Sequence, residues 1–125
     1  MLRLEAVSAL NSEILSVNTY FLWCEDPVRN FASMGIGKVD VQPVPGPDAA
    51  SFVLTNTGNT VALMIRLNLC GSDGEQILPV EYSDNYFHLL PGERKIVSIK
   101  WNTSDARGTE PVLRVSGFNV KDRQI

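Results

Sequence analysis

Hydrophobic and polar positions alternate along most of this chain, and a period of two predicts β-strands rather than helices. The clearest run is 61–70, where Leu63, Ile65, Leu67 and their apolar partners at every second position alternate with more polar residues. A run of this length is typical of a central strand, because a strand buries one side and turns the other outward. We therefore expect the side that carries Leu63, Ile65 and Leu67 to face the core.

Shorter runs of the same kind recur on both sides of this strand, separated by residues that favour turns. The expected strands are 38–42, 51–56, 61–70, 76–80, 85–89, 94–101 and 112–120. About seven short strands spaced in this way are typical of an immunoglobulin-like antiparallel β-sandwich, so we expect an all-β fold. No segment shows a 3.6-residue period of useful length.

Two further strand-like runs, 2–9 and 14–23, precede this set and predict a hairpin. A looser stretch with several glycines and prolines follows it. We therefore divide the chain into a strand pair (1–24), a connector (25–37) and an immunoglobulin-like domain (38–125). The chain starts in mid-strand, so we expect the pair to be the end of a preceding domain. An unpartnered strand pair favours association, which makes a strand-mediated homodimer a candidate.

One turn can be predicted in detail, between the strands 85–89 and 94–101. Pro91 pre-sets its φ near −65°, and Gly92 tolerates the positive φ that must follow in a type II turn. We expect this tight turn to connect two strands of the sandwich.

Charge and composition exclude several classes of function. The net charge is −3 and the basic residues are scattered, which argues against a nucleic-acid-binding surface. No apolar run approaches the ~20 residues of a membrane-spanning helix, so we expect no membrane partner. Cys24 and Cys70 have no metal-type spacing. They are either free buried thiols or one disulfide. We expect no metal and no cofactor.

Catalytic groups are equally scarce. His88 is the sole histidine, and residues 35–37 lack the third glycine of a phosphate-binding loop. The carboxylates Asp73, Glu75, Asp84 and Glu93 fall on expected turns, where they bond to local backbone more often than they catalyse. We therefore expect no catalytic residue in this chain.

Three aromatic residues are candidates for contact with a sugar or with another domain: Trp23, Tyr86 and Trp101. Aromatic side chains can stack on sugars, but in a small sandwich they more often fill the core. The sequence leaves both roles open for these three.

One segment carries a family resemblance. Residues 82–93 read Tyr-Ser-Asp-Asn-Tyr-Phe-His-Leu-Leu-Pro-Gly-Glu and resemble a string in the C-terminal immunoglobulin-like domain of family 2 glycoside hydrolases. The similarity is to the exo-β-D-glucosaminidase and mannosylglycoprotein endo-β-mannosidase subgroup. The strand pair 55–67 and the triplet Gly117-Phe118-Asn119 look like further parts of that domain. Residues 13–23 resemble the strand that closes the preceding sandwich domain.

This resemblance implies a non-catalytic, architectural domain of an enzyme that acts on β-linked glucosamine or mannose glycans. The family's two catalytic glutamates lie in a (β/α)8 barrel, which no part of this chain matches. The implied partners are the other domains of that enzyme, with glycan as a further candidate. A glycan-hydrolysing parent favours a secreted, periplasmic or vacuolar location. The alternatives are a carbohydrate-binding module and a free-standing adhesion-type domain that binds protein.

Overall fold

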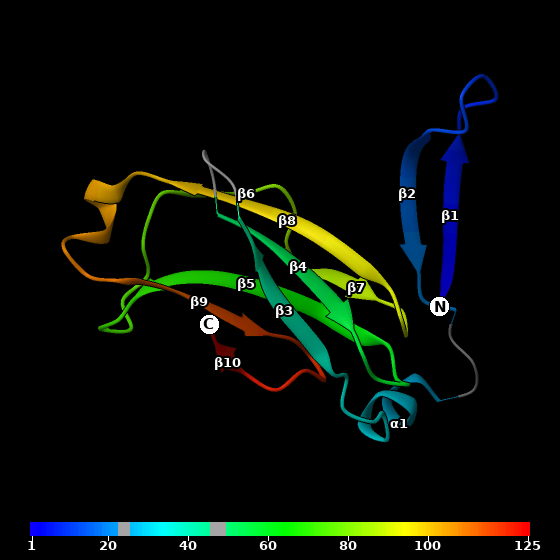
Figure 1. Ribbon diagram of the computed structural model, residues 1–125. Helices are drawn as coiled ribbons and strands as arrows, with labels where there is room; N and C mark the ends of the chain where they lie inside the picture. The colour runs from blue at the N-terminus through cyan, green and yellow to red at the C-terminus, as the bar shows by residue number, and fades with distance from the viewer. Residues whose placement is uncertain (23–25, 46–49) are drawn as a thin grey trace. The chain divides into compact units, whose positions relative to one another are not determined.

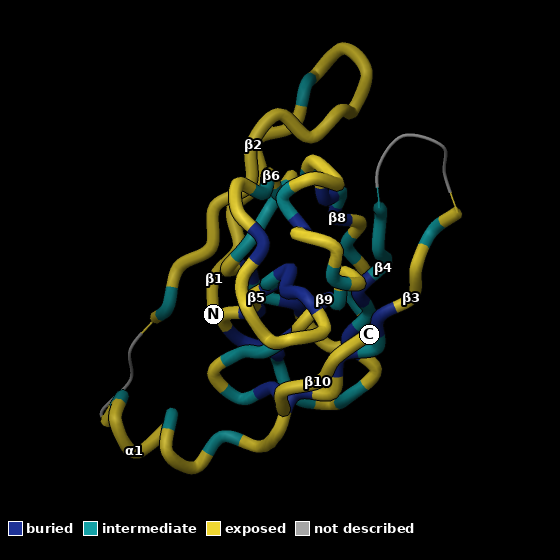
Figure 2. The backbone as a smooth tube through the Cα atoms, turned by 90° about the vertical axis from the view of Figure 1, so that its left-hand side faces the viewer, coloured by how far each residue is buried: buried dark blue, intermediate teal, exposed yellow. Residues whose placement is uncertain are grey.

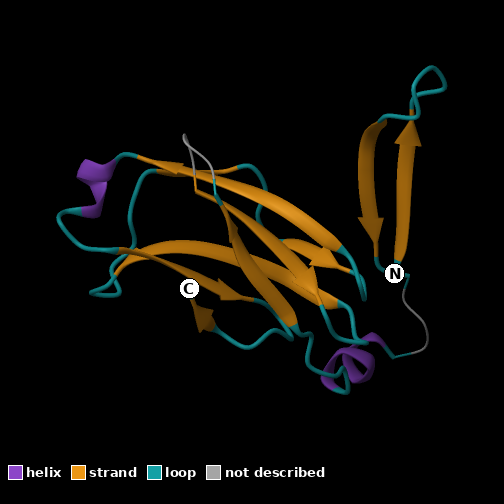
Figure 3. Ribbon diagram, in the orientation of Figure 1, coloured by secondary structure: helices purple, strands orange, loops and turns teal. Residues whose placement is uncertain are grey.

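The computed structural model describes residues 1–22, 26–45 and 50–125 of the chain. These residues form two compact units, 1–33 and 34–125, each described here by itself. Strands dominate the regular structure of both units (Figure 3). The all-β prediction is therefore confirmed.

The first unit contains the expected hairpin. Strands β1 (Leu2–Val7) and β2 (Ile14–Tyr20) pair in antiparallel fashion. A six-residue helix, α1 (Pro27–Ala32), follows in the stretch that showed no helical period. Its start is nevertheless encoded locally, because Asp26 caps the helix by accepting a hydrogen bond from Arg29 N and Pro27 occupies the first turn. The pattern missed this helix because six residues span fewer than two turns.

The hairpin is unusually exposed. The register places Leu2 and Leu4 opposite Tyr20 and Asn18, so they share one face, while Val17 points to the other. Every residue of both strands is exposed (Figure 2). A two-stranded hairpin alone is marginally stable in water, because it cannot bury enough apolar surface. Within the first unit, neither face of the hairpin is buried.

The second unit is a sandwich of two four-stranded antiparallel sheets, ordered β3-β4-β8-β6 and β10-β9-β5-β7 (Figure 1). A 3-10 turn, η1 (Thr103–Ala106), lies between β8 and β9. The immunoglobulin-like sandwich is confirmed. Its strands are β3 (Val39–Val44), β4 (Ala50–Asn56), β5 (Ala62–Gly71), β6 (Val80–Tyr82), β7 (Phe87–Leu89), β8 (Arg94–Trp101), β9 (Pro111–Ser116) and β10 (Arg123–Gln124).

The core lies between the two sheets. Ile65 and Leu67 from β5 meet Val97 and Ile99 from β8, and all four are at most 1% exposed. The predicted apolar side of β5 therefore faces the buried side of β8. Leu54 on β4 is fully buried in the same cluster.

A bulge near the start of β5 changes which residues of the strand join the core, so the prediction for Leu63 is only partly correct. Residues 62 and 65 of β5 pair with residues 89 and 87 of β7, so β5 carries one extra residue in this interval. Met64 takes the left-handed φ of 53° there and is exposed. The extra residue shifts the alternation, and Ala62 joins the core cluster in place of Leu63. Leu63 is buried as expected, but it stands apart from that cluster.

Several strand ends also differ from the predictions. The strand expected at 76–80 begins only at Val80, because Pro79 has no N–H to offer a neighbouring strand. Gln76 makes only an isolated bridge to Cys70. The last expected strand ends at Ser116, and β10 was missed because two residues show no period.

The predicted turn at Pro91-Gly92 is confirmed. Glu93 N donates to Leu90 O across 2.9 Å, and Gly92 has a φ of 78°. A Cβ at Gly92 would meet no atom within 4 Å, so only the backbone conformation restricts the residue.

Gly92→Val should therefore lower the free energy of unfolding by about 1–2 kcal/mol, because a branched residue is strained in the left-handed region. Gly92→Asn is the matched variant, since asparagine tolerates that region, and it should retain most of the stability. Urea denaturation of both variants measures the difference. Equal stability of the two would contradict the argument from φ.

Candidate functional site

The unusual string 82–93 lies where the chain crosses from β6 in one sheet to β7 in the other. Its polar side chains bond to the backbone of β5. The Tyr82 hydroxyl accepts a hydrogen bond from Leu69 N at 2.8 Å. Asn85 accepts from Leu67 N through Oδ1 at 2.8 Å and donates to Leu67 O through Nδ2 at 2.9 Å. Asn85 thus offers Leu67 the two bonds that a neighbouring strand would make.

His88 continues this pattern at the bulge, where its Nδ1 accepts a hydrogen bond from Met64 N at 3.0 Å. These contacts matter because β7 is only three residues long and cannot cover the whole edge of β5. Uncovered N–H and C=O groups on a strand edge cost free energy when buried and attract other strands when exposed. The string therefore completes the edge of a central strand.

The ionisation of the two aromatic polar groups fits this structural role. Burial raises the pKa of Tyr82 and outweighs the hydrogen bond from Leu69, which acts in the opposite direction. Burial lowers the pKa of His88. The neutral imidazole persists to lower pH as a result, and a neutral Nδ1 is what the bond from Met64 N requires.

The carboxylates behave as turn residues, as predicted. Asp73 Oδ1 accepts from Glu75 N, and Glu93 Oε2 accepts from Leu90 N. Asp84 Oδ1 accepts from Asn85 N, and its other oxygen pairs with Lys95. Three of the four candidates thus bond to neighbouring backbone.

Asn56 organises the loop after β4, although in the sequence it stands out only as part of the 55–67 strand pair. Its side chain is completely buried. Nδ2 donates to Thr60 O at 2.8 Å and to Leu89 O at 2.9 Å, while Oδ1 accepts from Gly58 N at 3.0 Å. The loop after β4 is thereby tied to the end of β7.

Asn119 makes a second clamp of the same kind. Its Oδ1 accepts from Leu63 N, and its Nδ2 donates to Val61 O and Gly35 O, all within 2.9 Å. Gly117 stands two residues earlier, where a Cβ would lie 2.8 Å from Leu63 O. Gly117 and Asn119, two members of the triplet 117–119, thus have structural roles.

The three aromatic candidates are not brought together. Trp23 lies outside the described residues. Tyr86 is 56% exposed, with a left-handed φ of 56°. Trp101 is half-buried against the core at the far end of β8. Lys95 marks the Tyr86 end of β8, because its ammonium lies 4.9 Å from the centre of the Phe87 ring. Trp101 lies six residues farther along β8 than Lys95, a distance of about 20 Å in an extended strand.

Among the described residues, no group of three or more histidine, cysteine or acidic side chains is arranged to hold a metal ion. No helix of the described chain is long and apolar enough to span a membrane. Cys70 is a buried free thiol, and Cys24 lies outside the described residues.

Comparison with known proteins identifies the domain type. A family described as the exo-beta-D-glucosaminidase Ig-fold domain matches residues 27–120. An exo-beta-D-glucosaminidase of Streptomyces avermitilis is 32% identical over 116 residues, which cover 82% of this chain and 13% of that protein. A mannosylglycoprotein endo-beta-mannosidase of Lilium longiflorum is 33% identical over 85 residues, which cover 62% of this chain and 9% of that protein.

The fold agrees with this match. The crystal structure of the Amycolatopsis orientalis exo-chitosanase CsxA superposes with a TM-score of 0.66 at 29% identity, over 77% of this chain and 12% of that one. The chain thus corresponds to a small part of much longer enzymes, and that part is an Ig-fold domain rather than a catalytic one. The chain belongs to the family of exo-beta-D-glucosaminidase Ig-fold domains.

Proposed function

We propose that this chain serves as a non-catalytic, architectural domain of a longer enzyme of the exo-β-D-glucosaminidase type. Such an enzyme would act on β-linked glucosamine or mannose glycans. One observation carries the proposal: the side chains of the 82–93 string that could have formed a site bond to the domain's own backbone. Tyr82, Asn85 and His88 all complete the edge of β5. Side chains that bond to the domain's own backbone favour a structural role for this segment.

The hairpin fits the same proposal as the closing strand pair of a preceding sandwich domain. We assign 1–24 to that pair, 25–37 to a connector and 38–125 to the immunoglobulin-like domain. A two-stranded hairpin with apolar residues on both strands is typical of a strand pair that completes a larger sheet. The end of the connector is anchored in the sandwich, because Gly37 N donates to Asn119 O and Gly37 bridges to Val120.

Tyr86 is the aromatic candidate that best suits a contact with a neighbouring domain. It is exposed, and a non-glycine residue at positive φ costs of order 1–3 kcal/mol. On β5, Ile65 pairs with Phe87, and Met64 is the residue directly before Ile65. Met64 is also exposed and has a positive φ. Two strained backbone positions that present large side chains are typical of a functional surface.

The isolated chain distinguishes the three functional classes in one set of measurements. An architectural domain should neither hydrolyse p-nitrophenyl β-D-glucosaminide above a buffer blank nor bind glucosamine oligomers in calorimetry. Turnover that disappears on mutating a carboxylate of this chain would refute the proposal in favour of an enzyme. Oligomer binding that is lost in Tyr86→Ala or Trp101→Ala would refute it in favour of a carbohydrate-binding module.

Removal of the hairpin should change the association state. The exposed apolar positions of β1 and β2 should pair with another copy of the chain, because an unpartnered sheet edge is a template for association. Sedimentation velocity of the chain with and without residues 1–24 measures this. We expect concentration-dependent dimers for the full chain and monomers for the shortened one. A full-length chain that stays monomeric at high concentration would contradict the prediction.

A further inference from the structure

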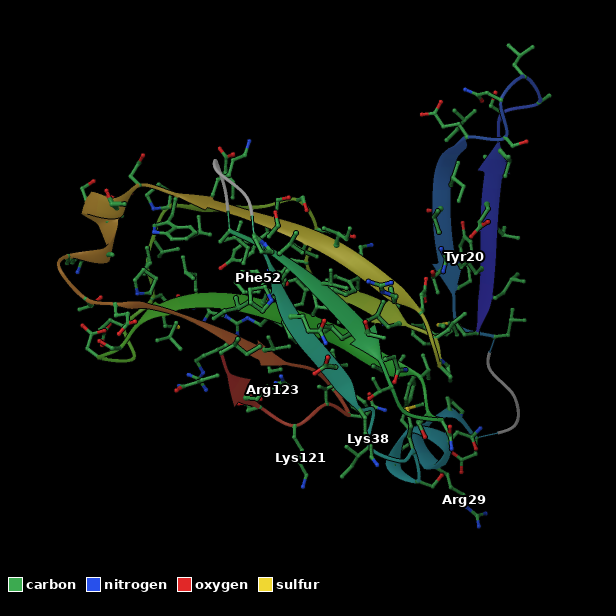
Figure 4. The ribbon with its side chains drawn as sticks, viewed as in Figure 1. Tyr20, Arg29, Lys38, Phe52, Lys121 and Arg123 are labelled. Carbon is green, nitrogen blue, oxygen red and sulfur yellow. The ribbon has the colours of Figure 1, made fainter. Side chains whose placement is uncertain are left out.

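A basic hollow opens between β3 and β10, the edge strands of the two sheets. Its volume is about 400 Å³. The buried side chains of Val39 and Val120 and the exposed Ile36 supply apolar lining. Figure 4 shows Lys121 and Arg123 on the segment that leads into and forms β10, and Lys38 just before β3. We call this site the β3–β10 hollow.

The charges that line the hollow are unbalanced. Arg123 is held in place, since Nη1 donates to Val39 O at 3.0 Å and Nη2 lies 3.9 Å from Asp40 Oδ1. Lys38 and Lys121 are exposed and form no ion pair with the described residues. Among the described residues of the lining Asp40 is the one carboxylate, so the three cations leave a net charge of +2. The chain as a whole carries −3, so the hollow has the opposite sign to the chain that forms it.

We propose that the β3–β10 hollow binds an acidic peptide segment, with two carboxylates on either side of an apolar side chain. Lys38 and Lys121 are free to pair with the carboxylates, while Val39 and Val120 offer an apolar floor for the side chain between them. The guanidinium of Arg123 is fixed by its hydrogen bond to Val39 O, so it supplies one positive charge at a defined position in the hollow. The segment belongs to a neighbouring domain of the longer enzyme, and this assignment alone rests on the proposed function.

The sign of the charge disfavours a glucosamine glycan as the occupant. Glucosamine carries an amine that is protonated near neutral pH, and a cationic glycan is repelled by three cations at close range. The hollow therefore complements an anion from a source other than that substrate. An extended peptide also suits its position, because β3 is the edge strand of its sheet, although Val39 O already accepts a bond from Arg123.

The full chain can be tested with the peptide acetyl-Asp-Leu-Asp-amide, monitored by amide chemical shifts. The peptide acetyl-Asn-Leu-Asn-amide has the same shape without charge and is the control ligand. We expect the acidic peptide alone to shift residues of the hollow, with an affinity that falls as salt is raised. Lys38→Gln and Lys121→Gln should each weaken binding about two- to fivefold, as expected for exposed ion pairs.

Lys100→Gln is the control variant, because Lys100 is an exposed lysine on β8, away from β3 and β10. It should leave the affinity unchanged, and circular dichroism should show all three variants folded. Equal binding of the neutral peptide, or equal loss in Lys100→Gln, would overturn the proposal. Sodium sulfate that produces the same shifts at the same concentration would also overturn it in favour of a simple anion site. Hydrolysis by the isolated chain would refute the proposed function and leave this binding result intact.

Discussion

Replacing Ile65 with alanine should lower the free energy of unfolding by about 2–5 kcal/mol, the usual range for an emptied core position. Ile65 is fully buried in the central cluster between the sheets. It also comes directly after the bulge of β5. Because Ile65 is paired with Phe87 on β7, we expect the surrounding residues to shift little into the space that alanine would leave. Chemical denaturation followed by tryptophan fluorescence measures the loss.

Ile96→Ala is the matched control for this change. Ile96 lies on β8, is 64% exposed, and loses the same atoms in the substitution. Its effect should remain within about 0.5 kcal/mol, as for other surface changes. A loss below about 1 kcal/mol for Ile65→Ala would mean that the wrong side of β5 has been assigned to the core.

Asn56→Ala should lower the free energy of unfolding by at least about 2 kcal/mol, since buried polar groups left without partners each cost about 1–3 kcal/mol. The substitution would remove the acceptor of Gly58 N and the donor to two carbonyls, one of them the buried Leu89 O. Thermal and urea denaturation measure the effect.

Asn59→Ala is the control, because Asn59 is an exposed asparagine in the same loop. Its substitution should leave stability nearly unchanged. Equal effects of the two variants would show that the loop tolerates loss of the buried clamp, and that the three hydrogen bonds of Asn56 contribute little.

The period of two was sufficient to predict the sandwich, because its long strands each bury one side. In β8, Val97 and Ile99 are buried while Ile96 is exposed, as the alternation predicts. The turn at Gly92 was also predictable, because proline followed by glycine selects a type II turn through backbone sterics alone.

Features that depend on contacts between distant residues could not be predicted. The bulge at Met64 interrupts a perfect alternation, and the partners that stabilise it are His88 and the segment after β9. The two residues of β10 become a strand only because β9 lies beside them. The hollow between β3 and β10 likewise joins Lys38 to Lys121, which are far apart in the sequence.

The family string at 82–93 was recognisable from sequence, whereas its purpose required the structure. Tyrosine, asparagine and histidine in one segment could equally suggest a binding site. In the structure their polar atoms face the backbone of β5 and satisfy it. A distinctive motif can therefore mark a demanding piece of fold rather than a site of chemistry.

The most direct test of the architectural role is a graft into an enzyme of known activity. The matching segment of the Amycolatopsis orientalis exo-chitosanase would be deleted in one variant and replaced by residues 27–120 of this chain in another. We expect the deletion to lower thermal stability and kcat/KM, and the graft to restore both in large part. The same graft carrying Asn56→Ala should restore less. A deleted enzyme as stable and active as the intact one, or a folded graft no better than the deletion, would contradict the account.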